Sequence, residues 1–60
     1  MFIKAEDYNG NKAWANIDNI SLIQHYNSDK YKVVLIGVDV PVYVYADDLY
    51  QIGIGQNENI

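Results

Sequence analysis

The sequence contains no cysteine and no arginine, and it has one proline, one histidine and one tryptophan among its 60 residues. The absence of cysteine excludes a disulfide framework, and a lone histidine leaves no His/Cys cluster for a structural metal. A domain of this length buries only about 60% of its unfolded surface, so its own core stabilises it weakly. Self-association is the remaining source of stability, and we therefore expect a homodimer or small oligomer.

Positive charge is also scarce. Four lysines stand against eight acidic residues, which gives a net charge of −4. Nucleic-acid-binding proteins usually show a basic patch with arginine, so the charge disfavours a nucleic-acid partner. The longest apolar run, residues 33–36, is far too short to span a bilayer, and no apolar signal segment follows Met1. We expect a soluble, cytoplasmic protein with no membrane partner.

The first part of the chain predicts a β-hairpin. Residues 2–8 alternate in side-chain character, which is typical of a strand. Asn9-Gly10 follows, and this dipeptide favours a type I′ turn because both central residues of such a turn need a positive φ. A return strand over residues 11–15 then places Ala5 opposite Trp14. In this register Trp14 is expected in the core, against the first strand.

The middle of the chain predicts a helical turn and a third strand. Asn16 is suited to capping a single turn that directs Ile17 and Ile20 toward the core. Residues 21–26 form the strand, and residues 27–30 form a polar loop of the Asx-turn type.

Residues 31–45 predict a second hairpin that is apolar on both of its faces. A two-residue turn at Gly37-Val38 would combine the aliphatic residues on one face. It would leave Lys32, Val34, Ile36, Tyr43 and Tyr45 together on the other. A three-residue loop would exchange these combinations, and Pro41 could force a bulge. Under either register, one small core covers only one of the two faces.

The remaining residues complete a single domain over residues 1–53. Residues 46–53 predict a short helix capped by Asp47, with Asp48 in its first turn, Leu49 and Ile52 on one face, and Gly53 at its end. Residues 54–60 are expected to form a frayed polar tail. The fold class is mainly β: a small five-stranded antiparallel meander or partly open barrel with a short C-terminal helix.

Two family resemblances follow from these segments. Residues 12–52 resemble the small flagellar FlbD-type proteins, whose Asn-Pro-Asp-x-x-Ile-like step appears here as Asn16-Ile17-Asp18-Asn19-Ile20, with Ile17 at the proline position. Residues 37–51 are similar to part of the carbon storage regulator family of RNA-binding β dimers, through Gly37, Pro41, Val44 and Asp48-Leu49-Tyr50-Gln51. Ala46 and Asp47 stand where that family has its RNA-contacting arginine. The first resemblance implies a flagellar accessory factor, and the second implies a β dimer without that RNA contact.

No motif for catalysis or for a cofactor is evident. His25 is the single histidine, and neither Ser21 nor Ser28 lies in a nucleophile motif such as Gly-x-Ser-x-Gly. Glu6 and Asp7 are adjacent on a strand and point to opposite faces, so they do not converge on a metal. Gly53-Ile54-Gly55 lacks the third glycine, the lysine and the helix of a phosphate loop. We therefore expect no enzyme activity, no metal and no cofactor.

The aromatic residues indicate a protein interface. Six tyrosines are more than a small core can hide, and tyrosine suits interfaces because it joins a large apolar body to one polar tip. We expect a homo-oligomeric interaction module that modulates another, unidentified protein, such as a bacterial or phage regulator or inhibitor. Its predicted interface is Tyr31, Lys32, Val34, Ile36, Tyr43 and Tyr45. The alternatives are nucleic-acid binding through Lys4, Lys12, Lys30 and Lys32 with stacking tyrosines, and mimicry of nucleic acid by the acidic surface.

Overall fold

The computed structural model describes residues 1–54, and the elements below are those of this part of the chain. Five strands, one 3₁₀ turn and one helix follow in order. They are β1 (Phe2–Glu6), β2 (Lys12–Asn16), η1 (Ile17–Asn19), β3 (Ile20–His25), β4 (Lys30–Leu35), β5 (Val42–Tyr45) and α1 (Ala46–Gln51). The structure confirms the predicted class, since all strand pairs are antiparallel and a short helix follows the last strand.

The first hairpin forms as expected, but its register differs by one residue from the prediction. Ala5 pairs with Ala13, and Trp14 pairs with Lys4. The Asp7 N–H donates to the Asn11 carbonyl, which leaves a loop of three residues, 8–10. Gly10 lies at φ 85°, and no described non-glycine residue has a positive φ. A type I′ turn would need a positive φ at Asn9 as well. Because side chains alternate between the two faces, this shift turns Trp14 to the outside, and the predicted core position of Trp14 is wrong.

Asp7 selects the longer loop. Its Oδ1 accepts hydrogen bonds from the backbone N–H groups of Asn9 and Asn11, each at 2.9 Å. The Gly10 N–H also donates to the Asp7 carbonyl at 2.9 Å. This is a turn followed by a glycine in the left-handed region, the usual form of a three-residue hairpin loop. The local side chain therefore overrides the Asn-Gly signal.

The hairpin loop is expected to respond to acid. The hydrogen bond from the Asn11 backbone is the main cause that lowers the pKa of Asp7 below its usual 3.8. A lowered folded-state pKa stabilises the fold above the unfolded pKa, and this contribution is lost as the pH falls through the folded value. As the pH falls through this lowered value, the hydrogen bond from the Asn11 N–H should weaken, which should shift the amide proton resonance of Asn11. Asp7→Asn retains an acceptor oxygen but no titration, so its loop should show no such acid step by NMR. An Asp7 carboxyl that titrates at its usual value would contradict this account.

The helical turn after β2 matches the prediction. The Asn16 side chain accepts a hydrogen bond from the Asp18 N–H at 3.0 Å and so caps η1. Ile17 and Ile20 are half-buried and pack against the core cluster.

The second hairpin has the register of the two-residue alternative. Lys32 pairs with Tyr43 and Val33 with Val42, which is the alignment that a turn at Gly37-Val38 would impose. The strands separate beyond that pair, however, and residues 36–41 form a longer loop. Pro41 precedes β5 directly. It has no N–H to donate, which is consistent with the ladder ending there.

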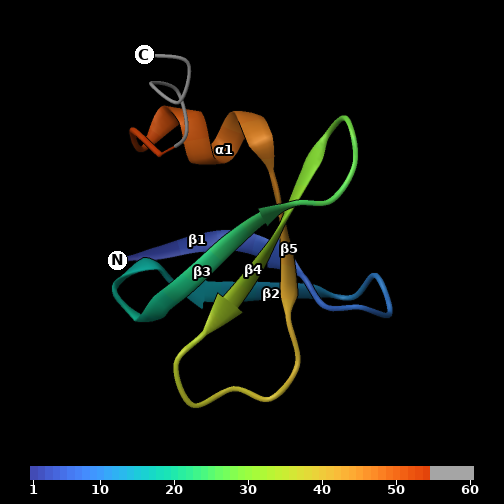
Figure 1. The fold of residues 1–60 in the computed structure, drawn as a ribbon, viewed down its shortest axis with the longest axis vertical. Coiled ribbons are helices and arrows are strands. Elements are labelled where there is room, and N and C mark those ends of the chain that lie inside the picture. The colour runs from blue at the N-terminus through green and yellow to red at the C-terminus, as the bar shows by residue number, and fades with distance from the viewer. Residues whose placement is uncertain (55–60) are drawn as a thin grey trace.

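The sheet is assembled from two units. The order is β2-β1-β5-β4-β3, so the β1–β2 hairpin joins a β3–β4–β5 meander through a short β1–β5 contact, Glu6 with Tyr43. Figure 1 shows β3 and β4 crossing in front of β1 and β2, with α1 at one end. β2 and β3 are therefore the two edges of one strongly coiled, open sheet.

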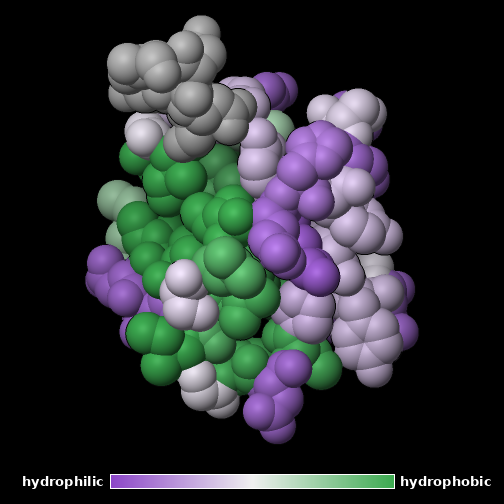
Figure 2. Space-filling model, in the orientation of Figure 1, coloured by the Kyte–Doolittle hydropathy of each residue, from purple (hydrophilic) through white to green (hydrophobic). Residues whose placement is uncertain are grey.

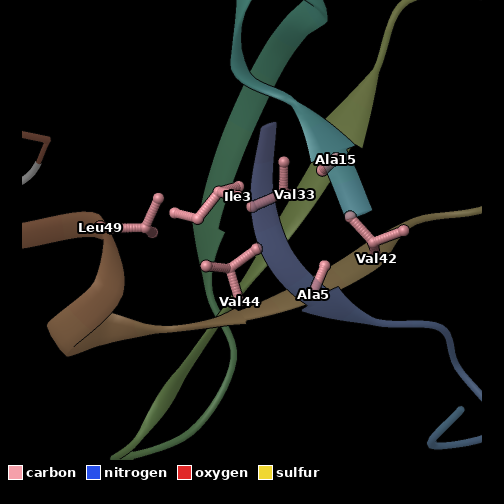
Figure 3. Close-up of a cluster of buried hydrophobic side chains, with 7 residues drawn as sticks. All are labelled: Ile3, Ala5, Ala15, Val33, Val42, Val44 and Leu49. Atoms are coloured by element: carbon pink, nitrogen blue, oxygen red, sulfur yellow. The ribbon is translucent and has the colours of Figure 1, made fainter. Parts of the chain in front are cut away.

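The core lies inside the coil. Figure 3 shows side chains from β1, β2, β4, β5 and α1 converging there. The cluster consists of Ile3, Ala5, Ala15, Val33, Val42, Val44 and Leu49. Its members are small, which lets a short sheet curl tightly.

The helix α1 closes one end of the core. Leu49 is 1% exposed, and Ile52 also packs against the core cluster, as predicted.

The predicted cap of this helix is wrong, because Asp47 is not the capping residue. Tyr45 holds the N-cap position without a side-chain hydrogen bond, and the Ala46 N–H donates to the Asp29 carbonyl instead. Asp47 and Asp48 occupy the first turn. Gly53 has φ 87°, and the Ile54 N–H donates to the Leu49 carbonyl. Of the predicted polar tail, residues 55–60 lie outside the described residues.

Candidate functional site

The outer face of the sheet carries every lysine of the chain. Lys4 and Lys12 lie on β1 and β2, and Lys30 and Lys32 lie on β4. Each alternates with core residues and therefore points away from the core. Exposed or half-buried aromatic residues of β2 and β5 share this face. We call the set the lysine–aromatic face: Lys4, Lys12, Trp14, Lys30, Lys32, Tyr43 and Tyr45.

Charge is segregated between the strands and their connections. Within residues 1–54, Glu6 is the one carboxylate on a strand, whereas all the aspartates lie in loops, in η1 or in α1. The strands are thus positively charged, although the chain as a whole carries −4. The sequence gives this pattern no obvious periodicity, and it becomes visible only when the strands are placed side by side.

Glu6 is itself neutralised. Its Oε1 lies 2.7 Å from Nζ of Lys30. The Glu6 side chain is 30% exposed and the Lys30 side chain is 25% exposed. The hydrogen bond to Glu6 raises the pKa of Lys30 above its usual 10.5. Deprotonation of Lys30 therefore breaks the ion pair only as the pH rises through this raised value. The same ammonium lies 5.0 Å from the ring centre of Tyr45, a cation–π distance.

A groove of about 300 Å³ opens where β1 diverges from β5. The Trp14 indole, 66% exposed, forms part of its wall, and Tyr45 contributes another aromatic side chain. Its volume falls at the lower end of the range for small-ligand sites. The full lining is Lys4, Ala5, Glu6, Lys12, Ala13, Trp14 and Tyr45.

Two further aromatic contacts lie on opposite faces of the sheet. The rings of Tyr26 and Tyr43 lie 4.6 Å apart at an interplanar angle of 48°. On the inner face, His25 meets Tyr31 edge to face at 5.9 Å. His25 lies on the edge strand β3 and is exposed. It therefore has a structural contact, and no charged partner of His25 is found in residues 1–54.

A separate hydrophobic surface lies on β3, β4 and the loop after β4. Leu22 pairs with Val34 on the outer face, and Ile36, Val38 and Val40 follow on the loop. Ile36 is 65% exposed. Figure 2 shows a continuous hydrophobic surface on the side of β3 and β4, bordered by a hydrophilic band. We call Leu22, Val34, Ile36, Val38 and Val40 the apolar patch.

The six residues predicted as an interface are divided by the structure. Val34 and Ile36 belong to the apolar patch, and Lys32, Tyr43 and Tyr45 belong to the lysine–aromatic face. Tyr31 lies on the inner side, half-buried against the core cluster, with its hydroxyl 3.5 Å from that of Tyr50. Tyr31 is thus not part of the outer surface that the other five share.

Sequence reasoning missed four exposed residues of these surfaces. The sequence of residues 21–26 does not show which side chains face the core, so the exposure of Leu22 is not predictable from it. A bulge between Ile20 and Leu22 interrupts the alternation and explains the ambiguity. Val38 and Val40 were assigned to a turn and a strand rather than to one loop. Trp14 was assigned to the core. The Asp7-x-Asn9-Gly10-Asn11 pattern, with an Asx-turn residue before Asn-Gly, was the signal that could have corrected its register.

Comparison of the chain with protein-family models, curated proteins and solved structures finds no match. The resemblances to the FlbD-type and carbon storage regulator families therefore stay predictions. Across residues 1–54, no group of three or more His, Cys, Asp or Glu side chains could hold a metal ion. No helix in that part of the chain is long and apolar enough to cross a membrane.

Proposed function

We propose that this protein is a non-enzymatic interaction module that works as a homodimer, joined through the apolar patch and the β3 edge. The observation that carries the proposal is the patch itself. Five aliphatic side chains of β3, β4 and the loop after β4 are half-buried or exposed in a chain of only 60 residues. Uncovered apolar patches of this kind are typical of association surfaces.

The β3 edge adds a means of pairing. Ile20–His25 contains no lysine, acidic residue or proline, which are the residues that usually block edge-to-edge contact. The bulge near Ser21 disturbs the start of the strand and leaves Leu22–His25 in regular register. Antiparallel pairing of two β3 strands about a two-fold axis beside Leu22 would bring the two Leu22 side chains together. It would also extend the sheet and place the two apolar patches next to each other on its outer face.

Association also compensates for the small core. The seven residues that are buried within the described part of the chain include two alanines and no aromatic side chain. Burying a Val, Leu or Ile side chain contributes about 1.5–3 kcal/mol. Covering the patch on both copies therefore adds a hydrophobic free energy that is comparable to the expected free energy of unfolding of the monomer. In this proposal the dimer is the form that binds and regulates a further protein.

The experiment is sedimentation equilibrium over about 1–100 μM, the range in which weak homodimers dissociate. The wild-type protein is expected to show a dimer mass. Ile36→Glu should shift it to the monomer, because a carboxylate cannot be buried unpaired at the centre of an apolar contact. Tyr8→Glu is the matched control. Tyr8 is 63% exposed, close to the 65% of Ile36, but it lies in the β1–β2 loop outside the patch.

The control variant should retain the dimer mass. A wild-type monomer at the highest concentration would overturn the proposal. An Ile36→Glu variant that stays dimeric would place the contact elsewhere on the surface.

A further inference from the structure

We propose that the lysine–aromatic face binds single-stranded nucleic acid, with a base seated in the groove beside Trp14 and the backbone phosphates on the surrounding lysines. This proposal is independent of the homodimer. It concerns a different surface, on β1, β2, β4 and β5, and the groove involves no residue of the apolar patch.

Charge complementarity identifies the partner as a polyanion. All four lysines of the chain lie on this face, and Glu6, its one carboxylate within residues 1–54, is already paired with Lys30 at 2.7 Å. Lys4, Lys12 and Lys32 remain to meet phosphates. The described aspartates lie off the strands, in loops, in η1 or in α1. The net charge of −4 is therefore a poor guide to this face.

The groove identifies the polyanion as one that carries bases. Trp14 is a large indole, 66% exposed in the middle of a strand, and Lys4 lies directly opposite on β1. A core function is excluded by that exposure, and an exposed indole beside lysine is suited to stacking on a base whose phosphate the ammonium contacts. Tyr45 lines the same groove.

The nucleic acid must be single-stranded because stacking of this kind requires unpaired bases. In a duplex, the base faces are covered by their neighbours and only the groove edges are accessible. A groove of about 300 Å³ is large enough to hold an unpaired base beside Trp14. An acidic peptide would satisfy the lysines but would leave the indole without a stacking partner, so the two partners are distinguishable.

Trp14 is the only tryptophan in the chain and therefore reports on its own site. The test titrates the 60-residue chain with ten-residue oligo-dT and oligo-U at low salt, and follows tryptophan fluorescence. Saturable quenching of the tryptophan emission is expected with at least one of the two oligonucleotides. The oligonucleotide that binds with the higher affinity identifies DNA or RNA as the partner. Polyphosphate and poly-glutamate supply the charge without bases, and should bind more weakly and leave the emission nearly unchanged.

Salt and variants sharpen the test. With three phosphate contacts, affinity should fall about twentyfold between 50 and 200 mM salt. Measured by anisotropy of a labelled oligonucleotide, Trp14→Ala should weaken binding about tenfold. Replacing Lys4 and Lys12 together by glutamine should lower the magnitude of the salt slope by about 1.4. Tyr8→Ala removes an equally exposed aromatic ring from outside the face and should leave binding unchanged.

Three results would overturn the proposal. These are no binding at 50 mM salt, polyphosphate binding as tight as that of the oligonucleotides, and an unchanged affinity in Trp14→Ala. Circular dichroism of each variant confirms that the fold is retained, which the exposure of the substituted side chains favours.

Discussion

Leu49→Ala is expected to lower the free energy of unfolding by about 2–5 kcal/mol, the range for truncating a fully buried leucine. Leu49 is 1% exposed and is the one residue of α1 in the core cluster. A chain of this length has a total stability of about 3–9 kcal/mol. The variant should therefore be partly or wholly unfolded at room temperature, because no other helix is available in residues 1–54 to close that end of the core.

Thermal and urea denaturation followed by circular dichroism would measure this effect. We expect the midpoint temperature to fall by about 10 °C or more. Gln51→Ala, an exposed change on the same helix, should move it by less than a few degrees. Because dimerisation would add stability that depends on concentration, the variants must be compared at one protein concentration. A Leu49→Ala variant as stable as Gln51→Ala would show that α1 does not hold the core.

Ala15→Glu is expected to abolish folding, whereas Trp14→Glu, one residue away, should be nearly neutral. Ala15 is 0% exposed and Trp14 is 66% exposed. A glutamate at position 15 would place a carboxylate without a partner among the core residues, at a cost of several kcal/mol. At position 14 the same carboxylate would lie in solvent and should change the stability by about 1 kcal/mol or less.

This pair of variants tests the register of the first hairpin directly. The type I′ register would bury Trp14 and expose its neighbours, so the two outcomes would be exchanged. One-dimensional proton NMR distinguishes a folded from an unfolded chain in each case. Tryptophan emission of the wild-type protein gives a second reading, since an exposed indole should emit at long wavelength and be readily quenched by acrylamide.

The two proposed surfaces can operate together. Coiling of the sheet brings β3 and β4 in front of β1 and β2 (Figure 1), and the apolar patch belongs to the first pair while Trp14 belongs to the second. A homodimer through β3 would leave both grooves open. Two linked sites on one strand would bind more tightly than one, through a raised effective concentration.

Much of the local structure was predictable from nearest neighbours in the sequence. Asn16 caps its own turn through a contact two residues away. The alternation from Lys30 to Leu35 places Val33 in the core and Lys32 outside. Gly53 lies in the left-handed region at the end of α1. Each of these features depends on residues within one turn or one strand, so a pattern of short range is sufficient to predict it.

The errors arose where a short-range signal competed with another contact. Asn9-Gly10 favours a two-residue turn, but the Asp7 carboxylate binds two backbone N–H groups that only a longer loop presents to it. Asp47 is a good capping residue by type, yet the chain enters the helix from β5 at Tyr45, and the Asp29 carbonyl already accepts the first free N–H. In the first case an Asx-turn residue before Asn-Gly marks the longer loop, whereas in the second the deciding contact comes from a distant loop.

The sequence by itself determined the composition of the strands, the turn at Asn16, and the presence of more apolar surface than a 60-residue chain can bury. The tertiary structure alone decided the strand order, in which β5 contacts β1, and with it the gathering of four lysines and Trp14 onto one side of the sheet. The physical reason is one of range. Alternation and capping act between residues that are close along the chain, whereas the pairing of Glu6 with Tyr43 joins distant segments and depends on how the whole sheet closes around its core.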